Sequence, residues 1–272
     1  MGPTARTTAE TTTEQPARWS SRQTSWDRQQ EAYLPDREQR FAALLDVVEA
    51  TRGEQPRVLD LACGTASITG RLLARLPGAT SVAVDLDPAL LRIAAGTHAG
   101  DERVRIVRAD LGTPDWVRAV TDAAPEVAHG GFDAVLTATA LHWLTPERQR
   151  ALYAEVAGLL APGGVFCNAD HMPDPGLPAL TGRLGQWRDA RRESLYAEGT
   201  ALSWSQWWDA ARSAPELADA VAERDAIFAA SHGSSESMPP YTTHLDYLRA
   251  AGFAEVGLVW RGLTDAAFAA VR

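Results

Sequence analysis

The chain has 272 residues, of which 45% are hydrophobic and 22% charged, a composition typical of a globular protein with a large core. Its formal net charge of −9 argues against a nucleic-acid partner, because phosphate-backbone binders usually present a basic face. No apolar run approaches the roughly 20 residues that span a bilayer, and no secretory signal is recognisable. Two cysteines, Cys63 and Cys167, lie in apolar contexts. We therefore expect a reduced, cytoplasmic protein with no membrane partner.

The first part of the chain predicts a leader followed by helices. Residues 1–17 are rich in threonine and poor in apolar side chains, which predicts a disordered leader. From about Trp19 to Thr51 apolar residues recur every three or four positions, which is the spacing of a helix with one apolar face.

Five predicted strands then alternate with helices. The strands are RVLDL, TSVAVD, RVRIVRAD, FDAVLTA and VFCNA, at 57–61, 80–85, 103–110, 132–138 and 165–169. A helix is predicted over 65–76, and an APGG turn at 161–164 precedes the fifth strand. Three further helices begin with a capping residue followed by proline, at Asp87-Pro88, Thr113-Pro114 and Thr145-Pro146. Right-handed crossovers between such strands predict a doubly wound parallel sheet.

The alternation stops after residue 170. Helices are predicted near 178–197, 203–213 and 215–230, with no strand in 171–240. A helix at 243–253 and two strands at 255–261 and 266–272 then resume the rhythm. We expect a leader (1–17), N-terminal helices with a cofactor-binding core (18–170), a helical insertion (171–240) and the closing elements of the core (241–272).

Acidic residues end the first three predicted strands, at the sheet edge where open α/β sheets bind ligands. They are Asp60, Asp85 and Asp110, and a turn of small residues follows Asp60. The chain contains neither the G-x-G-x-x-G pattern of dinucleotide folds nor the G-K-[ST] of a P-loop. Acids at these three places suit a ligand with an ammonium group, a ribose and an adenine amine, which describes S-adenosylmethionine.

Five segments resemble, in the same order, the class I S-adenosylmethionine-dependent methyltransferases. They are VLDLACGT, VAVDLDPALLRIA, RADL, FDAVLTATALHWL and LLAPGG. The resemblance covers roughly residues 55–170 and 241–272. It implies an α/β fold with a Rossmann-like, seven-stranded, doubly wound and mostly parallel sheet, and a helical lid inserted after strand five.

The resemblance assigns cofactor contacts residue by residue. It places the amino-acid moiety of the cofactor against Asp60 and the turn formed by Ala62, Cys63, Gly64 and Thr65.

The remaining cofactor contacts follow from the later strand ends. The resemblance makes Asp85 the ribose-binding acid and Asp110 the partner of the adenine amine. Leu86 and Leu111 would flank the adenine ring, and Thr137 would line the methionine side.

Two alanines of the first turn depart from the family pattern. The family usually has glycine where this chain has Ala62 and Ala66. A methyl group at each place narrows the turn, and we expect a slight backbone shift with cofactor binding retained.

Methyl transfer from a sulfonium is an in-line displacement, and alignment and desolvation can supply much of its rate. An oxygen or amine acceptor can also require a base. His142, just past the fourth strand, is the best-placed candidate, although local packing beside Trp143 explains it equally well. His171, after the fifth strand, comes second. No metal-ligand spacing stands out near Asp170 and Asp174, so we expect no metal.

Four of the nine tryptophans lie in the insertion: Trp187, Trp204, Trp207 and Trp208. Ser203 and Gln206 fit a capping box that starts a helix with three of these rings on one face. That face docks the insertion on the core, and its edge can also wall an apolar substrate pocket. The candidate substrate contacts are Trp26, Tyr33, Trp143 and Trp207.

These observations predict a methyltransferase that acts on an oxygen, as hydroxyl or carboxylate, of a small and partly apolar molecule. The insertion and the ALHW loop most resemble trans-aconitate and natural-product methyltransferases. A nitrogen or carbon acceptor and a non-catalytic, cofactor-binding regulatory protein are the alternatives. The partner is a small-molecule substrate and not a nucleic acid, and the chain is expected to be a monomer or homodimer.

Overall fold

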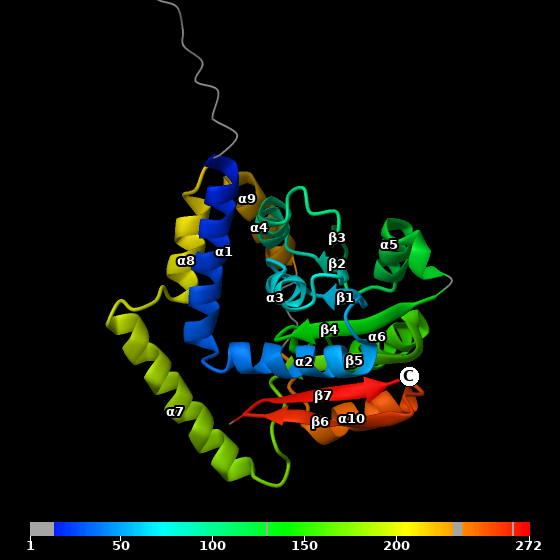
Figure 1. Ribbon diagram of the computed structural model, residues 1–272. Helices are drawn as coiled ribbons and strands as arrows, with labels where there is room; N and C mark the ends of the chain where they lie inside the picture. Colours follow the sequence, from blue (N-terminus) through cyan, green and yellow to red (C-terminus); the bar gives the residue numbers. More distant parts are fainter. Residues whose placement is uncertain (1–13, 129, 231–235, 263) are drawn as a thin grey trace, which may run out of the picture.

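A seven-stranded sheet forms the centre of the computed structural model, which describes residues 14–128, 130–230, 236–262 and 264–272 (Figure 1). Its strand order is β3-β2-β1-β4-β5-β7-β6. β1 to β5 pair in parallel, and β7 runs antiparallel between β5 and β6. The seven-stranded, mostly parallel fold expected from the sequence is confirmed. The strands are β1 (Arg57–Leu61), β2 (Thr80–Asp85), β3 (Val104–Arg108), β4 (Phe132–Ala138), β5 (Leu160–Asp170), β6 (Glu255–Arg261) and β7 (Ala266–Val271).

Helices cover both faces of the sheet, because alternate residues of each strand point to opposite faces. Val58 packs with α2 (Arg37–Arg52) and α3 (Ser67–Arg75), whereas its neighbour Leu59 packs with helices of the other face. The helices of that other face are α5 (Asp115–Ala123), α6 (Pro146–Leu159) and α10 (Tyr241–Ala250). No helix within the described ranges combines the length and hydrophobicity of a membrane span.

Helices also stand at the edge where the parallel strands end (Figure 1). α1 (Glu14–Tyr33) and α8 (Trp204–Arg212) lie side by side there, and α9 (Ala218–Ala230) packs on α4 (Pro88–Thr97). The capping box at the start of α8 is confirmed, with the Gln206 N–H donating to Ser203 Oγ and the Ser203 N–H to Gln206 Oε1. α7 (Pro178–Ala197) has no buried residue along its described length.

The beginning of the chain differs from the prediction. α1 begins at Glu14, so residues 14–17 are helical and not part of a disordered leader. Residues 1–13 of that expected leader lie outside the described part of the chain. The predicted 19–51 helical region consists of two helices, with a break at residues 34–36 between α1 and α2.

Two turn predictions also differ. α5 has Pro114 at its N-cap and no side-chain cap, because the Thr113 hydroxyl donates to the Asp110 carbonyl instead (3.3 Å). The APGG segment is not a separate turn: β5 begins at Leu160 and contains the segment as an irregularity in its pairing with β4. The other predicted helices and strands are present, with ends that coincide with the prediction or differ from it by up to three residues.

Candidate cofactor and acceptor site

Asp60, the penultimate residue of β1, has a buried carboxyl, and one of its oxygens has no hydrogen-bond partner in the described part of the chain. It is 1% exposed, and its Oδ2 accepts hydrogen bonds from the Thr69 N–H (3.2 Å) and hydroxyl (2.8 Å). Burial raises the pKa of Asp60 to about 7. Oδ1 is buried and has no hydrogen-bond partner among the described residues. A buried, unpaired carboxyl oxygen is costly unless a ligand satisfies it, so this atom fits the ammonium end of a cofactor.

In the turn after Asp60, two alanines adopt the left-handed backbone conformation that favours glycine. Ala62, Gly64 and Ala66 have φ values of +53°, +56° and +60°. A non-glycine residue in this left-handed region is strained by about 1–2 kcal/mol. The chain therefore keeps a turn suited to glycine while carrying two methyl groups, and the strain is stored beside the expected cofactor site.

Asp85 joins the first turn to the second. Its Oδ2 accepts the Gly64 N–H (2.8 Å), and its Oδ1 accepts the Asp87 N–H (2.8 Å). Burial raises the pKa of Asp85 to about 6. Asp87 in turn caps α4 by accepting from the N–H groups of Ala89 and Leu90. The expected ribose-binding acid is thus held in place by the backbone of both turns.

The remaining predicted cofactor residues lie at neighbouring strand ends. Asp110 is exposed and its Oδ1 accepts the Gly112 N–H (2.7 Å). Leu86 is half-buried and Leu111 is buried. Thr137 is fully buried, and its hydroxyl has no partner among the described residues. This second unpaired oxygen, like Asp60 Oδ1, fits a polar ligand at the carboxyl edge.

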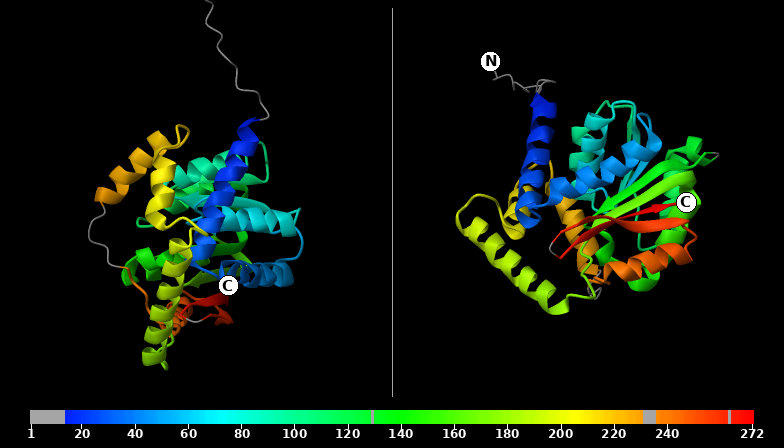
Figure 2. Two further views of the ribbon diagram at one scale, coloured as in Figure 1. Left: turned by 90° about the vertical axis from the view of Figure 1, so that its left-hand side faces the viewer. Right: turned by 60° about the horizontal axis from the view of Figure 1, so that its bottom comes forward.

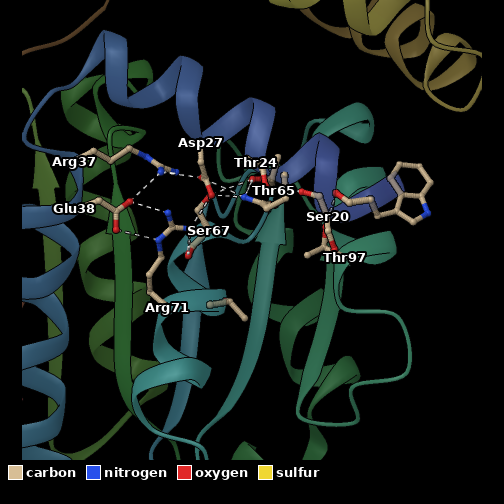
Figure 3. Close-up of polar contacts among 12 residues, drawn as sticks. Ser20, Thr24, Asp27, Arg37, Glu38, Thr65, Ser67, Arg71 and Thr97 are labelled. Atoms are coloured by element: carbon tan, nitrogen blue, oxygen red, sulfur yellow. Dashed lines mark hydrogen bonds and ion pairs between the residues drawn. The ribbon is translucent and has the colours of Figure 1, made fainter. Parts of the chain in front are cut away.

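α1 contributes to the cofactor turn in a way that the sequence did not indicate. Gln23 of α1 donates from Nε2 to the hydroxyl oxygens of Thr65 (2.9 Å) and Ser67 (2.9 Å). Thr65 is fully buried, and Ser67 is the first residue of α3. The N-terminal helix is therefore fastened directly to the turn that is expected to contact the amino-acid moiety (Figure 3).

An ion-pair cluster continues this contact (Figure 3). Asp27 of α1 accepts from the Ser67 hydroxyl (2.9 Å), from Arg37 (2.9 Å) and from Arg71 (2.9 Å). Burial opposes ionisation of Asp27, but the two guanidinium groups outweigh it and lower the pKa of the carboxyl. The cluster ties α1 to α2 and α3 beside the cofactor turn.

The acceptor side of the edge holds a buried histidine–aspartate pair. His142 lies in the 3-10 helix Leu141–Trp143 after β4, and its Nδ1 is 2.7 Å from Oδ1 of Asp170, the last residue of β5. The His142 backbone N–H also donates to Asp170 Oδ2 (3.2 Å). Burial lowers the pKa of His142, but the hydrogen bond and charge of Asp170 outweigh it and raise the pKa above its usual value.

A second pair lies beside the first. His171 Nδ1 is 2.6 Å from Asp265 Oδ1, and the rings of His171 and His142 are 5.0 Å apart. The His171 backbone N–H donates to Asp170 Oδ1 (2.8 Å). Asp265 also bonds Arg40 of α2 and Arg188 of α7 (3.0 Å). Burial opposes the ionisation of Asp265, but its hydrogen bond with His171 and the nearby cations lower its pKa.

His142, Asp170 and His171 could together hold a cation, since each offers one ligand atom within 4.8 Å of the others. The sequence showed no such spacing, because His142 and Asp170 are 28 residues apart and meet only through the pairing of β4 with β5. In each pair Nδ1 contacts a carboxylate, which orients the ring and leaves Nε2 as its second nitrogen. The arrangement therefore holds two imidazole rings in fixed orientations, each fastened to a carboxylate through Nδ1.

The four aromatic candidates separate into two groups. Tyr33 lies 6.5 Å from the His171 ring, and Trp143, which is 55% exposed, lies 5.1 Å from the His142 ring. Trp26 and Trp207 are 6% and 3% exposed and pack against each other between α1 and α8. The structure therefore brings Tyr33 and Trp143 to the histidines and places Trp26 and Trp207 in the contact between α1 and α8.

The two raised pKa values predict that cofactor affinity depends on pH. Asp60 titrates near pH 7 and Asp85 near pH 6, so both lose their charge as the pH falls below neutrality. The ionised forms accept hydrogen bonds from an ammonium and a ribose more strongly. We expect S-adenosylhomocysteine affinity, measured by calorimetry, to fall as the pH drops from about 8 to about 5.5, by at most about tenfold per pH unit for each carboxyl. Constant affinity over this range would show that neither carboxyl contacts the cofactor.

The strand order with an antiparallel β7 and the carboxyls at three strand ends define a Rossmann-like fold of the methyltransferase type. A methyltransferase-domain family model matches residues 59–166. Trans-aconitate 2-methyltransferase of Methylobacterium radiotolerans is 32% identical over 209 residues, which cover 73% of this chain and 69% of the relative. The chain belongs to the class I S-adenosylmethionine-dependent methyltransferases, and its cofactor is S-adenosylmethionine.

Two other comparisons agree with this assignment. An uncharacterized methyltransferase of Mycobacterium tuberculosis is 36% identical over 126 residues, 46% of this chain and 55% of the relative. The chain thus matches only about half the length of that relative. An O-methyltransferase family protein of Burkholderia thailandensis has the same fold, with a TM-score of 0.52 at 18% identity over 98% of this chain and 74% of that protein.

Proposed function

We propose that the chain transfers the methyl group of S-adenosylmethionine to an oxygen, as hydroxyl or carboxylate, of a small and partly apolar molecule. The buried His142–Asp170 pair beside the cofactor edge is the observation that most supports this proposal. The relative named trans-aconitate 2-methyltransferase and the fold neighbour named as an O-methyltransferase support a small-molecule, oxygen-bearing acceptor.

The residues divide between holding the cofactor and activating the acceptor. When bound, S-adenosylmethionine supplies an activated methyl group on a sulfonium. Asp60 Oδ1 has no protein partner among the described residues and would accept a hydrogen bond from the ammonium group of the cofactor. Asp85 would accept hydrogen bonds from the ribose hydroxyls in addition to those from the backbone. On the acceptor side, Nε2 of neutral His142 takes the proton of a hydroxyl, while Asp170 holds Nδ1–H and stabilises the imidazolium that forms. A carboxylate acceptor needs no base, and the site then contributes alignment and desolvation.

The test is a screen with isotopically labelled S-adenosylmethionine and matched sets of small hydroxy, carboxylic and amino compounds. We expect label to transfer to hydroxy or carboxylic members and one equivalent of S-adenosylhomocysteine to form. If label is transferred only to nitrogen or only to carbon, the oxygen acceptor is wrong and the nitrogen or carbon alternative given in the sequence analysis replaces it. Tight cofactor binding with no transfer to any set would favour a regulatory cofactor-binding protein.

The proposal includes a cytoplasmic location and a chain that acts as a monomer or homodimer, without a nucleic-acid partner. Cys63 and Cys167 are both free and buried, which suits a reducing compartment. The net charge of −9 supports a partner other than nucleic acid.

A further inference from the structure

A cavity of about 510 Å³ lies between the α1–α2 corner, α7 and the β6–β7 hairpin. This volume falls within the range of small-molecule binding sites. Figures 1 and 2 show α7 running beside the outer end of the hairpin, so that the insertion and the core each supply one side. Four arginines line the cavity, three from α7 and one from β6: Arg188, Arg191, Arg192 and Arg261.

Four arginines and two aspartates line the cavity, so the lining is cationic although the chain as a whole is acidic. Arg192 and Arg261 also pair with Asp189 and Asp174, which lie outside the lining. Its two aspartates are already engaged: Asp36 pairs with Arg40, and Asp265 pairs with Arg40, Arg188 and His171. Arg191 has no carboxylate partner within the described part of the chain. Arg188 donates from Nη1 to Thr264 (2.6 Å) and Asp265 (3.0 Å), whereas its buried Nε–H donates to no partner there. The Arg191 guanidinium, which has no carboxylate partner there, and the undonated Nε–H of Arg188 are suited to bind carboxylate or phosphate.

Two indole rings add flat surfaces to these cations. Trp187 lines the cavity and is 54% exposed, and the Arg191 guanidinium lies 5.7 Å from its ring. Trp260 lines the opposite wall on β6, with Arg40 5.3 Å from its ring. Arginine stacks on planar groups as well as binding anions. The lining therefore suits a planar ligand that bears an anionic group.

The cavity adjoins the two histidine–aspartate pairs. Asp265 lines the cavity and holds the His171 ring through Nδ1 at 2.6 Å. The Arg192 guanidinium lies 4.8 Å from the Tyr33 ring, and the Tyr33 ring in turn lies 6.5 Å from the His171 ring. The cavity lining is thus connected to His171 directly through Asp265 and indirectly through Arg192 and Tyr33.

We propose that this cavity binds the anionic group of a planar acceptor, a carboxylate or a phosphate ester on an aromatic or conjugated frame. Arg191 and Arg188 bind the anion, Trp187 and Trp260 contact the planar frame, and the oxygen to be methylated lies toward His142 and His171. The inference rests on the proposed methyl transfer for the role of the ligand as acceptor. The binding site itself stands without it.

Calorimetry on the full chain saturated with S-adenosylhomocysteine tests the cavity with three probes of one shape. They are naphthalene-2-carboxylate, 2-naphthyl phosphate and the neutral naphthalene-2-carboxamide. We expect at least one of the two anions to bind about tenfold or more tightly than the carboxamide. Whichever anion binds more tightly shows whether the site prefers a carboxylate or a phosphate ester. Its affinity should fall between about 0.05 M and about 0.5 M salt, because the guanidinium groups are partly exposed.

Arg191→Gln should weaken binding of that anion about tenfold. Arg183→Gln is the matched control, because Arg183 lies on the same helix, is exposed and does not line the cavity. Equal binding of all three probes, or equal loss in both variants, would overturn the proposed anion site. S-adenosylhomocysteine affinity should be unchanged in both variants.

The two proposals can fail separately. Anion binding that depends on Arg191, without methyl transfer to any acceptor, would support the anion site in the cavity and contradict the proposed methyl transfer. If neutral acceptors are methylated and Arg191→Gln leaves their KM unchanged, the proposed function is supported. The cavity is then not the site that binds the acceptor.

Discussion

His142→Ala is expected to lower the rate of methyl transfer to a hydroxyl acceptor by about 10²–10⁴-fold, the usual contribution of a general base. The variant removes Nε2 as proton acceptor while leaving the carboxyls of the cofactor edge in place. Rates should be measured in single turnover with saturating cofactor. In the native chain the rate should rise with pH through a pKa above the usual histidine value, because Asp170 favours the protonated, inactive form.

His142→Asn provides the sharper control. The asparagine amide can replace Nδ1–H as donor to Asp170 but cannot accept the acceptor's proton. If His142 is the base, both variants lose a similar fraction of the rate and both lose the pH dependence. If asparagine restores the rate, the histidine acts only by packing and hydrogen bonding.

Asp85→Ala should weaken S-adenosylhomocysteine binding by about 1–3 kcal/mol, which corresponds to about 5–150-fold in Kd. The substitution removes the expected acceptor of the ribose hydroxyls, and also the carboxylate that holds the N–H groups of Gly64 and Asp87. Calorimetry at about pH 8, where the native carboxyl is ionised, gives the largest difference.

Asp101→Ala is the matched control for Asp85. Asp101 also accepts backbone and guanidinium hydrogen bonds, from Arg103, but it precedes β3 and therefore lies at the opposite edge of the sheet. The Asp101→Ala variant should bind S-adenosylhomocysteine with the same affinity as the native chain. An unchanged affinity in Asp85→Ala, with a native urea transition, would show that the ribose does not bind at this carboxyl.

Much of the cofactor edge was predictable because its signals are local. β1, β2 and β3 each end close to an acid, and their apolar cores and proline-capped helices mark the element boundaries. A parallel sheet brings such strand ends to one edge whatever the details of packing. The seven-stranded fold followed from the same alternation, and Asp60 and Asp85 lie where it placed them.

The acceptor side was less predictable because its contacts join distant segments. His171 and Asp265 are 94 residues apart in the sequence. The one available signal is the direction of β7: an antiparallel strand begins where its parallel neighbours end, so the residue before Ala266 belongs to the same edge as His171. The sequence suggests no role for Asp170 beyond that of an acid near a metal site whose spacing it does not support, whereas the structure makes it the partner of His142.

The contact of α1 with the cofactor turn had no signal in the sequence. Gln23 and Asp27 are single polar residues on a predominantly polar helix, and only the packing of α1 on the sheet edge gives them partners at Thr65 and Ser67. The tryptophan excess was predictable as a docking face, but which rings would remain exposed depended on how α8 meets α1.

Helix α7 has no buried residue, so its amino-acid sequence can change more easily than that of a buried helix. A substitution on an exposed helix face usually changes the free energy of unfolding by less than about 0.5 kcal/mol, and every residue of α7 is at least partly exposed. Some of its side chains contact the rest of the chain: Arg188 bonds Asp265, Arg192 lies against the Tyr33 ring and Tyr196 bonds Gln29. The exposed remainder can therefore change with little effect on folding. Exchanging this helix between family members is a route to new ligand preferences, because the sheet and its strand-end carboxyls would be inherited intact.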